Sequence, residues 1–221
     1  MRDSVPGAFV IPRVYPILDS SFLPSGLDER RKYLEGLGKS LTEAGIQLLE
    51  YRNKFGTDAE VLRDARILRL AMPAGQVRLV MDDRVDVALA AGFDGVHVDA
   101  GDLPPEDARH LLGLERIVGT SATTEQKLEE ALGFPVDYIS FGPIYPTTTK
   151  QTSSVPIGLE GVQRYRQIAG DGVHMVAAAG ITLDNAPAIL AAGADTVAVA
   201  AAIFRHSNPA LEFQRWREEL R

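Results

Sequence analysis

The sequence contains no cysteine among its 221 residues. Disulfides, thiolate metal sites and catalysis by a thiol are therefore excluded. It also lacks a run of about 18 apolar residues, the length that a membrane-spanning helix needs. Residues 1–12 lack the basic region and apolar stretch of a secretory signal. These absences lead us to expect a cytoplasmic protein with no membrane partner.

Positive charge is also scarce. The chain has 23 Lys and Arg against 30 Asp and Glu, and its formal net charge is -7. Such a protein has no broad basic surface for the phosphates of nucleic acids, so we expect no nucleic-acid partner. A small phosphorylated ligand is not excluded, because a few cations, backbone N–H groups and a divalent metal ion can neutralise it locally.

What is present is the composition of a globular domain. Hydrophobic residues make up 45% of the chain and charged residues 24%, close to the average for folded domains. Hydrophobic cores grow to roughly 250 residues before chains divide. We therefore expect a single domain over residues 1–221. The composition leaves the oligomeric state open, and a homo-oligomer is compatible with it.

Short β-rich apolar runs alternate with longer amphipathic segments along the whole chain. The pattern predicts eight strands, at residues 14–18, 46–51, 77–81, 95–98, 116–119, 138–141, 173–178 and 196–200. It predicts helices at 27–44, 58–71, 85–91, 105–112, 124–132, 159–168, 185–192 and 209–220. This alternation indicates an α/β protein with parallel strands, and eight units match a (β/α)8 TIM barrel. The alternative is an open doubly wound sheet.

Charged residues follow the second predicted strand. Alternation along a strand sends Glu50, Arg52 and Lys54 to the same side, where two cations would face one pocket beside a carboxylate. In such barrels the active face lies at the ends of the strands and in the loops that follow them. The alternative is a solvated cluster of charges at the end of a strand.

Acidic residues follow the next two predicted strands, as Asp82-Asp83 and, after His97, as Asp102. Carboxylates from neighbouring loops suit a magnesium ion that is shared between protein and substrate phosphates. As alternatives, Asp83 and Asp102 cap the helices that follow them, and His97 is a core histidine with satisfied hydrogen bonds.

Two further regions suit anionic oxygens. The segment 142–150 follows the sixth predicted strand and carries three threonines and Lys150; the alternative is a proline-restrained surface loop. Small residues follow strands seven and eight, where Gly180, Ala200 and Ala201 would let backbone N–H groups approach a phosphate, by analogy with other barrels.

The order of these motifs resembles the thiamine phosphate synthase family. The motifs are Glu-x-Arg-x-Lys, Asp-Asp-Arg-Val-Asp, Asp-Gly-Val-His, Gly-Pro-Ile-Tyr-Pro-Thr-Thr-Thr-Lys and Ala-Gly-Ile-Thr-x-x-Asn. The resemblance covers roughly Tyr15 to Phe204 and is most specific at 142–150. It implies a transferase that joins a pyrimidine diphosphate to a thiazole phosphate, with Mg2+ as cofactor and these two small molecules as partners.

The resemblance also implies a role for each residue of the site. Magnesium would be held by Asp83 and Asp102. The leaving diphosphate would be bound by Arg52, Lys54, Ser121 and Lys150. Glu50 and His97 would face the pyrimidine, and Asp82 would be a further substrate-binding residue. The thiazole phosphate would be bound by Thr147, Thr149, Gly180, Ala200 and Ala201.

Several positions depart from the family pattern. The family usually has Gln at Glu50 and Asn at Asp82, so two amides are replaced by carboxylates. Extra negative charge beside a diphosphate opposes binding unless a metal, a cation or a raised pKa compensates. The family's Gly-Gly pair is Ala179-Gly180, and its phosphate-contacting Ser is Ala201, which keeps the N–H group but lacks the hydroxyl.

Two other functions stay open at this point. One is a thiazole tautomerase of the same fold, and the other is a non-catalytic regulator that binds thiazole phosphate. The tautomerase typically uses a His where this chain has Thr123. The cations Arg52, Lys54 and Lys150 favour the synthase.

Overall fold

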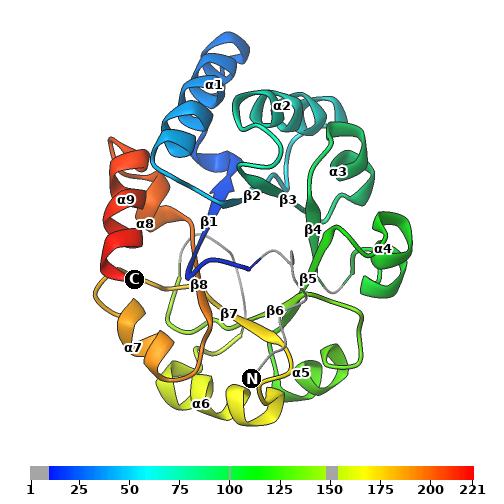
Figure 1. The fold of residues 1–221 in the computed structure, drawn as a ribbon, viewed down its shortest axis with the longest axis vertical. Coiled ribbons are helices and arrows are strands. Elements are labelled where there is room, and N and C mark those ends of the chain that lie inside the picture. The colour runs from blue at the N-terminus through cyan, green and yellow to red at the C-terminus, as the bar shows by residue number, and fades with distance from the viewer. Residues whose placement is uncertain (1–9, 100, 148–153) are drawn as a thin grey trace.

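Eight parallel strands close into a barrel in sequence order, so that β1 pairs with both β2 and β8 (Figure 1). The computed structural model describes residues 10–99, 101–147 and 154–221. The strands are β1 (Val14–Asp19), β2 (Leu48–Arg52), β3 (Arg78–Asp82), β4 (Gly95–Val98), β5 (Ile117–Ala122), β6 (Tyr138–Phe141), β7 (His174–Ala178) and β8 (Thr196–Val199). The predicted TIM barrel is confirmed, and the open doubly wound sheet is wrong.

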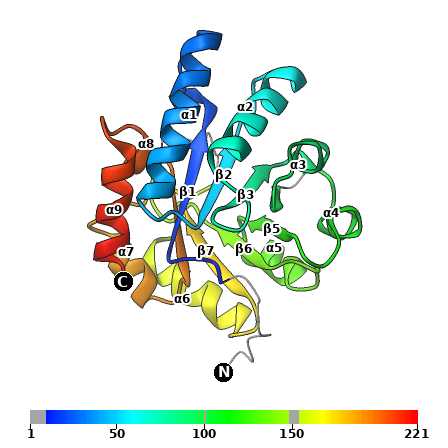
Figure 2. The same cartoon turned by 45° about the horizontal axis from the view of Figure 1, so that its top comes forward.

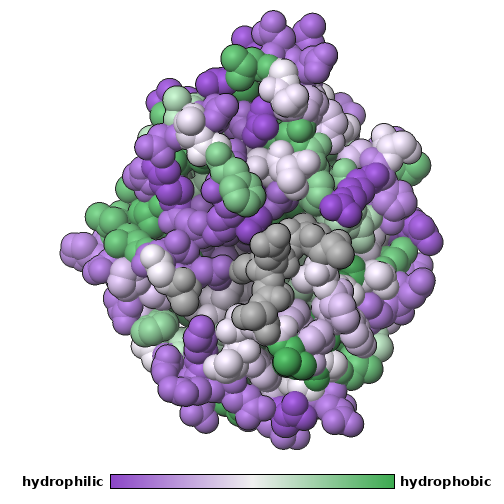
Figure 3. Space-filling model, turned by 180° about the vertical axis from the view of Figure 1, so that it is seen from behind, coloured by the Kyte–Doolittle hydropathy of each residue, from purple (hydrophilic) through white to green (hydrophobic). Residues whose placement is uncertain are grey.

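Helices surround the barrel on the outside (Figures 1 and 2). They are α1 (Leu27–Glu43), α2 (Asp58–Ala71), α3 (Val85–Ala91), α4 (Pro105–Leu112), α5 (Glu125–Ala131), α6 (Gly158–Ala169), α7 (Ala186–Ala191), α8 (Ala201–Phe204) and α9 (Pro209–Glu219). Across the described ranges, no helix is both long and apolar enough to cross a membrane. The face seen in Figure 3 is largely hydrophilic, with hydrophobic residues in small separate groups.

Two short helices differ from the sequence-based expectation. The eighth strand ends at Val199, and the four-residue helix α8 begins directly after Ala200. A 3-10 helix, η1 (Ser20–Phe22), follows β1, with the Asp19 side chain accepting a hydrogen bond from the Ser21 N–H at 2.9 Å. Elements of three or four residues carry too little periodicity to be recognised in a sequence. Both lie at the carboxyl end of the barrel strands.

A mostly apolar layer fills the part of the barrel interior nearer the amino-terminal ends of the strands. Its inward-facing members are Tyr15, Leu48, Val80, Ile117, Tyr138, Val176 and Ala198, joined by Ile11. The Tyr138 ring fits across the barrel because Gly119 lies next to it, where a Cβ would be 2.0 Å from Tyr138 Cζ. Side chains alternate along a strand, so the next inward position beyond Leu48 is Glu50 and the next beyond Val80 is Asp82. The interior therefore changes from apolar to polar towards the carboxyl ends of the strands.

The opposite, amino-terminal end of the barrel is held by three similar ion-pair clusters. In each, an aspartate just before an even-numbered strand accepts a hydrogen bond from a backbone N–H of the neighbouring strand and pairs with an arginine of a preceding helix. The three sets are Asp94 with Leu79 N (2.8 Å) and Arg69 (2.7 Å), Asp137 with Val118 N (2.8 Å) and Arg109 (2.7 Å), and Asp195 with Met175 N (2.8 Å) and Arg166 (2.5 Å). Each cluster ties a helix to two strands, which stabilises the fold at the end away from the cavity.

Replacing Asp94 by Ala should lower the free energy of unfolding by about 2 kcal/mol, because the Leu79 N–H loses its acceptor and the guanidinium of Arg69 loses its charged partner. Urea denaturation followed by circular dichroism measures this change. The matched control is Glu35→Ala, which breaks the exposed Arg31–Glu35 pair and should leave the transition midpoint nearly unchanged. Equal shifts in the two variants would contradict a stabilising role for the clusters.

Candidate active site

A cavity of about 370 Å³ opens among the carboxyl ends of the barrel strands. Every strand contributes to its wall, with side chains that include Asp19 of β1, Arg52 of β2, His97 of β4 and Ser121 of β5. The loops after β6, β7 and β8 complete it. This is the end at which barrel enzymes carry their chemistry, and the cavity is large enough for small-molecule ligands.

One side of the cavity carries two cations held by carboxylates. The guanidinium of Arg52 forms an ion pair with Asp19 and lies 3.7 Å from Oδ2 of Asp82. The ammonium of Lys54 is 2.9 Å from Oδ2 of Asp82 and also forms an ion pair with Asp83. Burial disfavours both cations, but the carboxylates outweigh it and raise the pKa of Arg52 and of Lys54. Both side chains are therefore positively charged and aimed at the same region.

Asp83 and Asp102 face each other next to Lys54. Burial and the Asp83 carboxylate raise the pKa of Asp102 to about 6, and Asp102 Oδ2 accepts a hydrogen bond from the Asp99 N–H at 2.9 Å. Oδ1 of Asp83 is buried and has no hydrogen-bond partner among the described residues. Asp83 also adopts a left-handed backbone conformation, with φ of 64°, which is uncommon for a residue other than glycine and is often retained at functional sites.

These two carboxylates fit a magnesium ion. A hard divalent cation between them would reduce the repulsion between the two carboxylates and would bind the buried oxygen that has no hydrogen-bond donor. Within the described part of the chain, no three His, Asp or Glu side chains are grouped to hold a metal ion, so water molecules and substrate oxygens would complete the coordination. The capping alternative is wrong: Arg84 and Pro104 are the N-cap residues of α3 and α4, and neither helix has a side-chain cap.

The floor of the cavity is a chain of hydrogen-bonded side chains centred on His97. Nδ1 of His97 is 2.9 Å from the Tyr138 hydroxyl, which in turn is 2.9 Å from the Tyr15 hydroxyl. Nε2 of His97 is 2.8 Å from Oγ of Ser121. His97 is thus satisfied by hydrogen bonds and also lines the cavity, so the two interpretations of this residue are compatible.

Glu50 is a buried carboxyl on the same floor, with only 4% of its surface exposed. Burial raises the pKa of Glu50 to about 7, and the negative charge of Asp82 adds to this effect. The pKa of His97 is raised as well: burial disfavours the charged imidazole, but Asp99 and Glu50 outweigh it. Near neutral pH, Glu50 can therefore hold a proton and donate a hydrogen bond to a ligand.

The other side of the cavity is formed by small residues after β7 and β8. Ala179 and Gly180 are both left-handed, with φ of 72° and 70°, and a Cβ on Gly180 would lie 2.5 Å from the carbonyl oxygen of Tyr145. Ala200 and Ala201 line the same side, at the start of α8. The first N–H groups of a helix have no acceptor within the helix, so this side offers backbone donors with little side chain in front of them.

Most of the predicted site residues are brought together by the fold. The cavity wall includes Glu50, Arg52, Asp82, His97, Ser121, Thr147, Gly180, Ala200 and Ala201. Lys54, Asp83 and Asp102 lie next to it on the Asp82 side. Thr149 and Lys150 lie outside the described residues. The interpretation of the charges after β2 as a solvated cluster is wrong, because Arg52 and Lys54 are paired with buried carboxylates.

The wall residues that the sequence analysis did not single out include Tyr15, Asp19 and Tyr138. Asp19 directly follows the first predicted strand and could have been found by applying the strand-end rule to that strand. The two tyrosines come from within strands, where an aromatic residue is indistinguishable from ordinary core.

A closed parallel barrel with a cavity at the carboxyl ends of its strands, lined by charged side chains on one side and small residues on the other, places the chain in the class of (β/α)8 barrels. The comparisons with known proteins then narrow this class. Residues 15–203 match the family model described as thiamine monophosphate synthase. The chain therefore belongs to the thiamine monophosphate synthase family.

Relatives of known name agree with this assignment. The thiamine-phosphate synthase of Koribacter versatilis is 40% identical over 191 residues, covering 86% of this chain and 88% of that protein. The enzyme of the same name from Agrobacterium fabrum is 41% identical over 167 residues, covering 74% and 76%. Among solved structures, the thiamine phosphate pyrophosphorylase of Pyrococcus furiosus superimposes with a TM-score of 0.77 at 28% identity, covering 94% of this chain and 96% of that one.

The raised pKa of Glu50 makes stability depend on pH in a definite direction. Between about pH 4.5 and about 7 the folded state keeps a proton that the unfolded state releases, so this group destabilises the fold as pH rises through that window. Glu50→Gln removes the titration and should gain stability relative to the parent protein as pH rises across it, by at most a few kcal/mol. Chemical denaturation at a series of pH values tests this, and parallel curves for the two proteins would refute it.

Proposed function

We propose that the chain is a thiamine-phosphate synthase, which joins 4-amino-2-methyl-5-hydroxymethylpyrimidine diphosphate to 4-methyl-5-(2-phosphoethyl)-thiazole to form thiamine phosphate and diphosphate. The observation that carries this proposal is a single cavity with two ends of different character. Paired cations and carboxylates form one end, and small residues with backbone donors form the other. The two phosphorylated substrates need two such anion sites at one reaction centre.

The reaction moves one pyrimidine methylene group from oxygen to nitrogen. The bond between this carbon and the diphosphate oxygen breaks, and the electron pair leaves with the diphosphate. The ring nitrogen of the thiazole then supplies the electron pair of the new carbon–nitrogen bond. No side chain has to act as a nucleophile, so stabilisation of the departing negative charge is the main task of the protein.

We assign that task to the cationic end of the cavity. Arg52 and Lys54, together with Ser121 and Lys150, would bind the leaving diphosphate. A magnesium ion bound by Asp83 and Asp102 would supply further neutralisation of the diphosphate oxygens. Asp82 would hold the ammonium of Lys54, 2.9 Å away, in position.

The remaining predicted residues would bind the two rings. Glu50 and His97 on the cavity floor would face the pyrimidine. When protonated, Glu50 would donate a hydrogen bond to a ring nitrogen; when ionised, it would accept one from the exocyclic amine. The thiazole phosphate would lie against Thr147, Thr149 and the backbone of Gly180, Ala200 and Ala201.

The tautomerase alternative is not favoured, since relatives at 40% and 41% identity carry the synthase name. No feature of the described residues singles out a regulator without activity. The cytoplasmic location and a homo-oligomeric state stay predictions.

The direct test mixes purified protein, Mg2+, the pyrimidine diphosphate and the thiazole phosphate, and follows thiamine phosphate and diphosphate by chromatography. The parent protein should form both products in equal amounts. Asp83→Asn is the control, because Asn keeps the shape of the side chain and tolerates a left-handed backbone while losing the charge. We expect product formation to fall at least about 100-fold in this variant at low Mg2+.

No product from the parent protein would refute the proposed function. Full activity of Asp83→Asn at low Mg2+ would leave the function in place and refute the metal site. The two results are therefore distinguishable within one experiment.

Lys54→Ala tests the cationic end of the cavity. Loss of one charge that acts on the departing diphosphate should lower kcat by about 100-fold. Because Lys54 also pairs with the buried carboxylate of Asp82, the melting temperature should fall as well. Steady-state kinetics and thermal unfolding of the same preparation separate the two effects. A large fall in the melting temperature with a small change in kcat would show that Lys54 is structural.

A further inference from the structure

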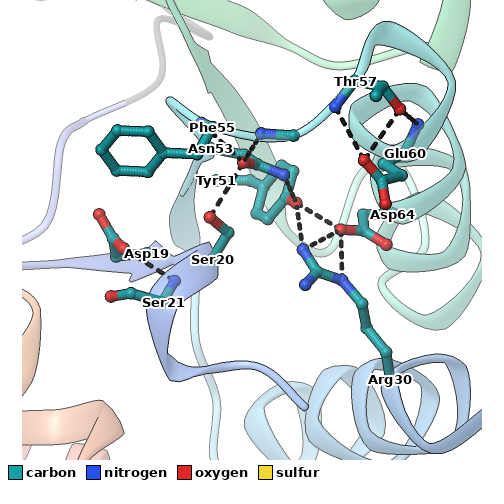
Figure 4. A network of polar contacts seen from close by, with 11 residues as sticks. Asp19, Ser20, Ser21, Arg30, Tyr51, Asn53, Phe55, Thr57, Glu60 and Asp64 are labelled. Atoms are coloured by element: carbon teal, nitrogen blue, oxygen red, sulfur yellow. Dashed lines mark hydrogen bonds and ion pairs between the residues drawn. The ribbon is translucent and has the colours of Figure 1, made fainter. Parts of the chain in front are cut away.

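The outward face of β2 carries polar groups where core packing alone would require apolar ones. Glu50 and Arg52 point into the cavity, so Tyr51 of β2 and Asn53, which directly follows the strand, point towards the surrounding helices. Figure 4 shows these two side chains at the centre of a hydrogen-bonded network that reaches α1, α2 and the end of β1. None of the polar groups of this network has a part in the chemistry proposed above.

Asn53 is the hub of the network. Its Oδ1 accepts hydrogen bonds from the Gly56 N–H at 2.8 Å, from the Phe55 N–H at 3.3 Å and from Oγ of Ser20 at 3.0 Å. Its Nδ2 donates to the Tyr51 hydroxyl at 3.0 Å. One side chain therefore fixes the turn after β2 and ties it to the end of β1, next to Asp19.

Tyr51 connects this hub to a buried ion pair. The Tyr51 hydroxyl donates to Oδ2 of Asp64 at 2.5 Å, and Arg30 donates to the same oxygen from Nε at 2.8 Å and from Nη2 at 2.5 Å. Tyr51 is fully buried and Asp64 is 2% exposed. Asp64 belongs to α2 and Arg30 to α1, so the turn is anchored to two helices that pack side by side (Figures 1 and 2).

Gly56 provides independent evidence that the position of Asn53 is closely constrained. A Cβ on Gly56 would lie 2.6 Å from Nδ2 and 3.0 Å from Oδ1 of Asn53. These distances are shorter than van der Waals contact, so any larger residue would displace the amide. Glycine at this position is explained by the space that the amide occupies.

The residues on either side of Asn53 in the sequence are the two described cations of the cavity. Arg52 precedes it and Lys54 follows it. Among the described residues, their charged groups bind the carboxylates of Asp19, Asp82 and Asp83. The backbone that carries both cations is thus held from the outside of the barrel, by groups that do not touch the cavity.

We propose that Asn53, anchored through Tyr51 to the Arg30–Asp64 ion pair, is a positioning residue that places Arg52 and Lys54 against the leaving diphosphate. This inference rests on the proposed function and adds residues that no motif pointed to. Buried ion pairs are weak sources of stability, and apolar replacements often match them. A positional role explains why a buried Asp, an Arg and a Tyr hydroxyl converge on a turn next to the cations. A displacement of about 1 Å at a reaction centre can lower a rate by about 100-fold.

Three variants disturb the hub in different ways. Asn53→Ala removes it, Gly56→Ala pushes against its amide, and Tyr51→Phe removes only the hydroxyl that anchors it. The matched control is Asn208→Ala, which removes another asparagine that accepts a backbone hydrogen bond, from Leu211 N at 3.1 Å, at the start of α9. Circular dichroism and thermal unfolding show whether each variant is folded.

The measurements are binding of inorganic diphosphate with Mg2+ by calorimetry and steady-state kinetics with each substrate varied in turn. We expect the three hub variants to bind diphosphate roughly tenfold more weakly or worse, with a raised KM for the pyrimidine diphosphate and a lower kcat. The KM for the thiazole phosphate should stay unchanged, because its proposed site lies on the loops after β6, β7 and β8, away from Asn53. Asn208→Ala should leave all of these values unchanged.

The outcomes separate this inference from the proposed function. If the parent protein makes no thiamine phosphate, the proposed function fails. If it does, and the folded hub variants bind diphosphate as well as the parent, the positioning role is wrong. A rise in both KM values in proportion to the loss of thermal stability would also overturn it, because that result describes general loosening of the fold.

Discussion

The alternation of side chains along strands that close into a barrel is the constraint on which the rest of this structure depends. Each strand sends every second side chain inward, and closure brings the inward sets of all eight strands to a common axis. The inward positions nearer the amino-terminal ends of the strands are mostly apolar, and those nearer the carboxyl ends include the polar side chains of β2 to β6, so core and cavity are stacked along the same axis. The outward positions next to the cavity are then free to hold its walls, as Tyr51 does on β2.

The charge balance of the cavity follows from this stacking. Asp19, Glu50, Asp82 and Asp99 line the wall, whereas Arg52 is the cation among the described lining residues. Lys54 lies just outside and bridges Asp82 and Asp83. So many carboxylates at one site oppose an anionic substrate unless a metal ion, protonation or additional cations compensate. Burial raises the pKa values of Glu50 and Asp102, and neighbouring carboxylates add to that effect.

The two ends of the barrel have separate tasks. At the amino-terminal end, aspartates pair with arginines and with backbone N–H groups. These pairs join helices to strands and have a structural role. At the carboxyl end, charged groups meet in a cavity, and one carboxylate oxygen of Asp83 has no donor among the described residues. Ala179 and Asp83 also adopt left-handed conformations at this end. Strain and unsatisfied polar groups are concentrated where a ligand can offset their cost.

The sequence by itself determined the order of strands and helices, the barrel, and the inward alternation of Glu50 and Arg52, because these depend on local periodicity that pairing then reinforces. It also carried the family, through motifs in a fixed order. That Asp83 and Asp102 lie close together was implied by the family resemblance alone, and the ion pairs of Lys54 with Asp82 and Asp83 were not predicted, since these contacts join different loops. Tyr15 and Tyr138 were recognised as site residues only from the closed barrel, whereas Asp19 follows a predicted strand and could have been found from the sequence. The role of Asn53 was not visible in the sequence for the same reason. Packing between β2 and the helices brings Asn53 together with Ser20 and Tyr51 and, through Tyr51, with Arg30 and Asp64. No spacing within the chain encodes that arrangement.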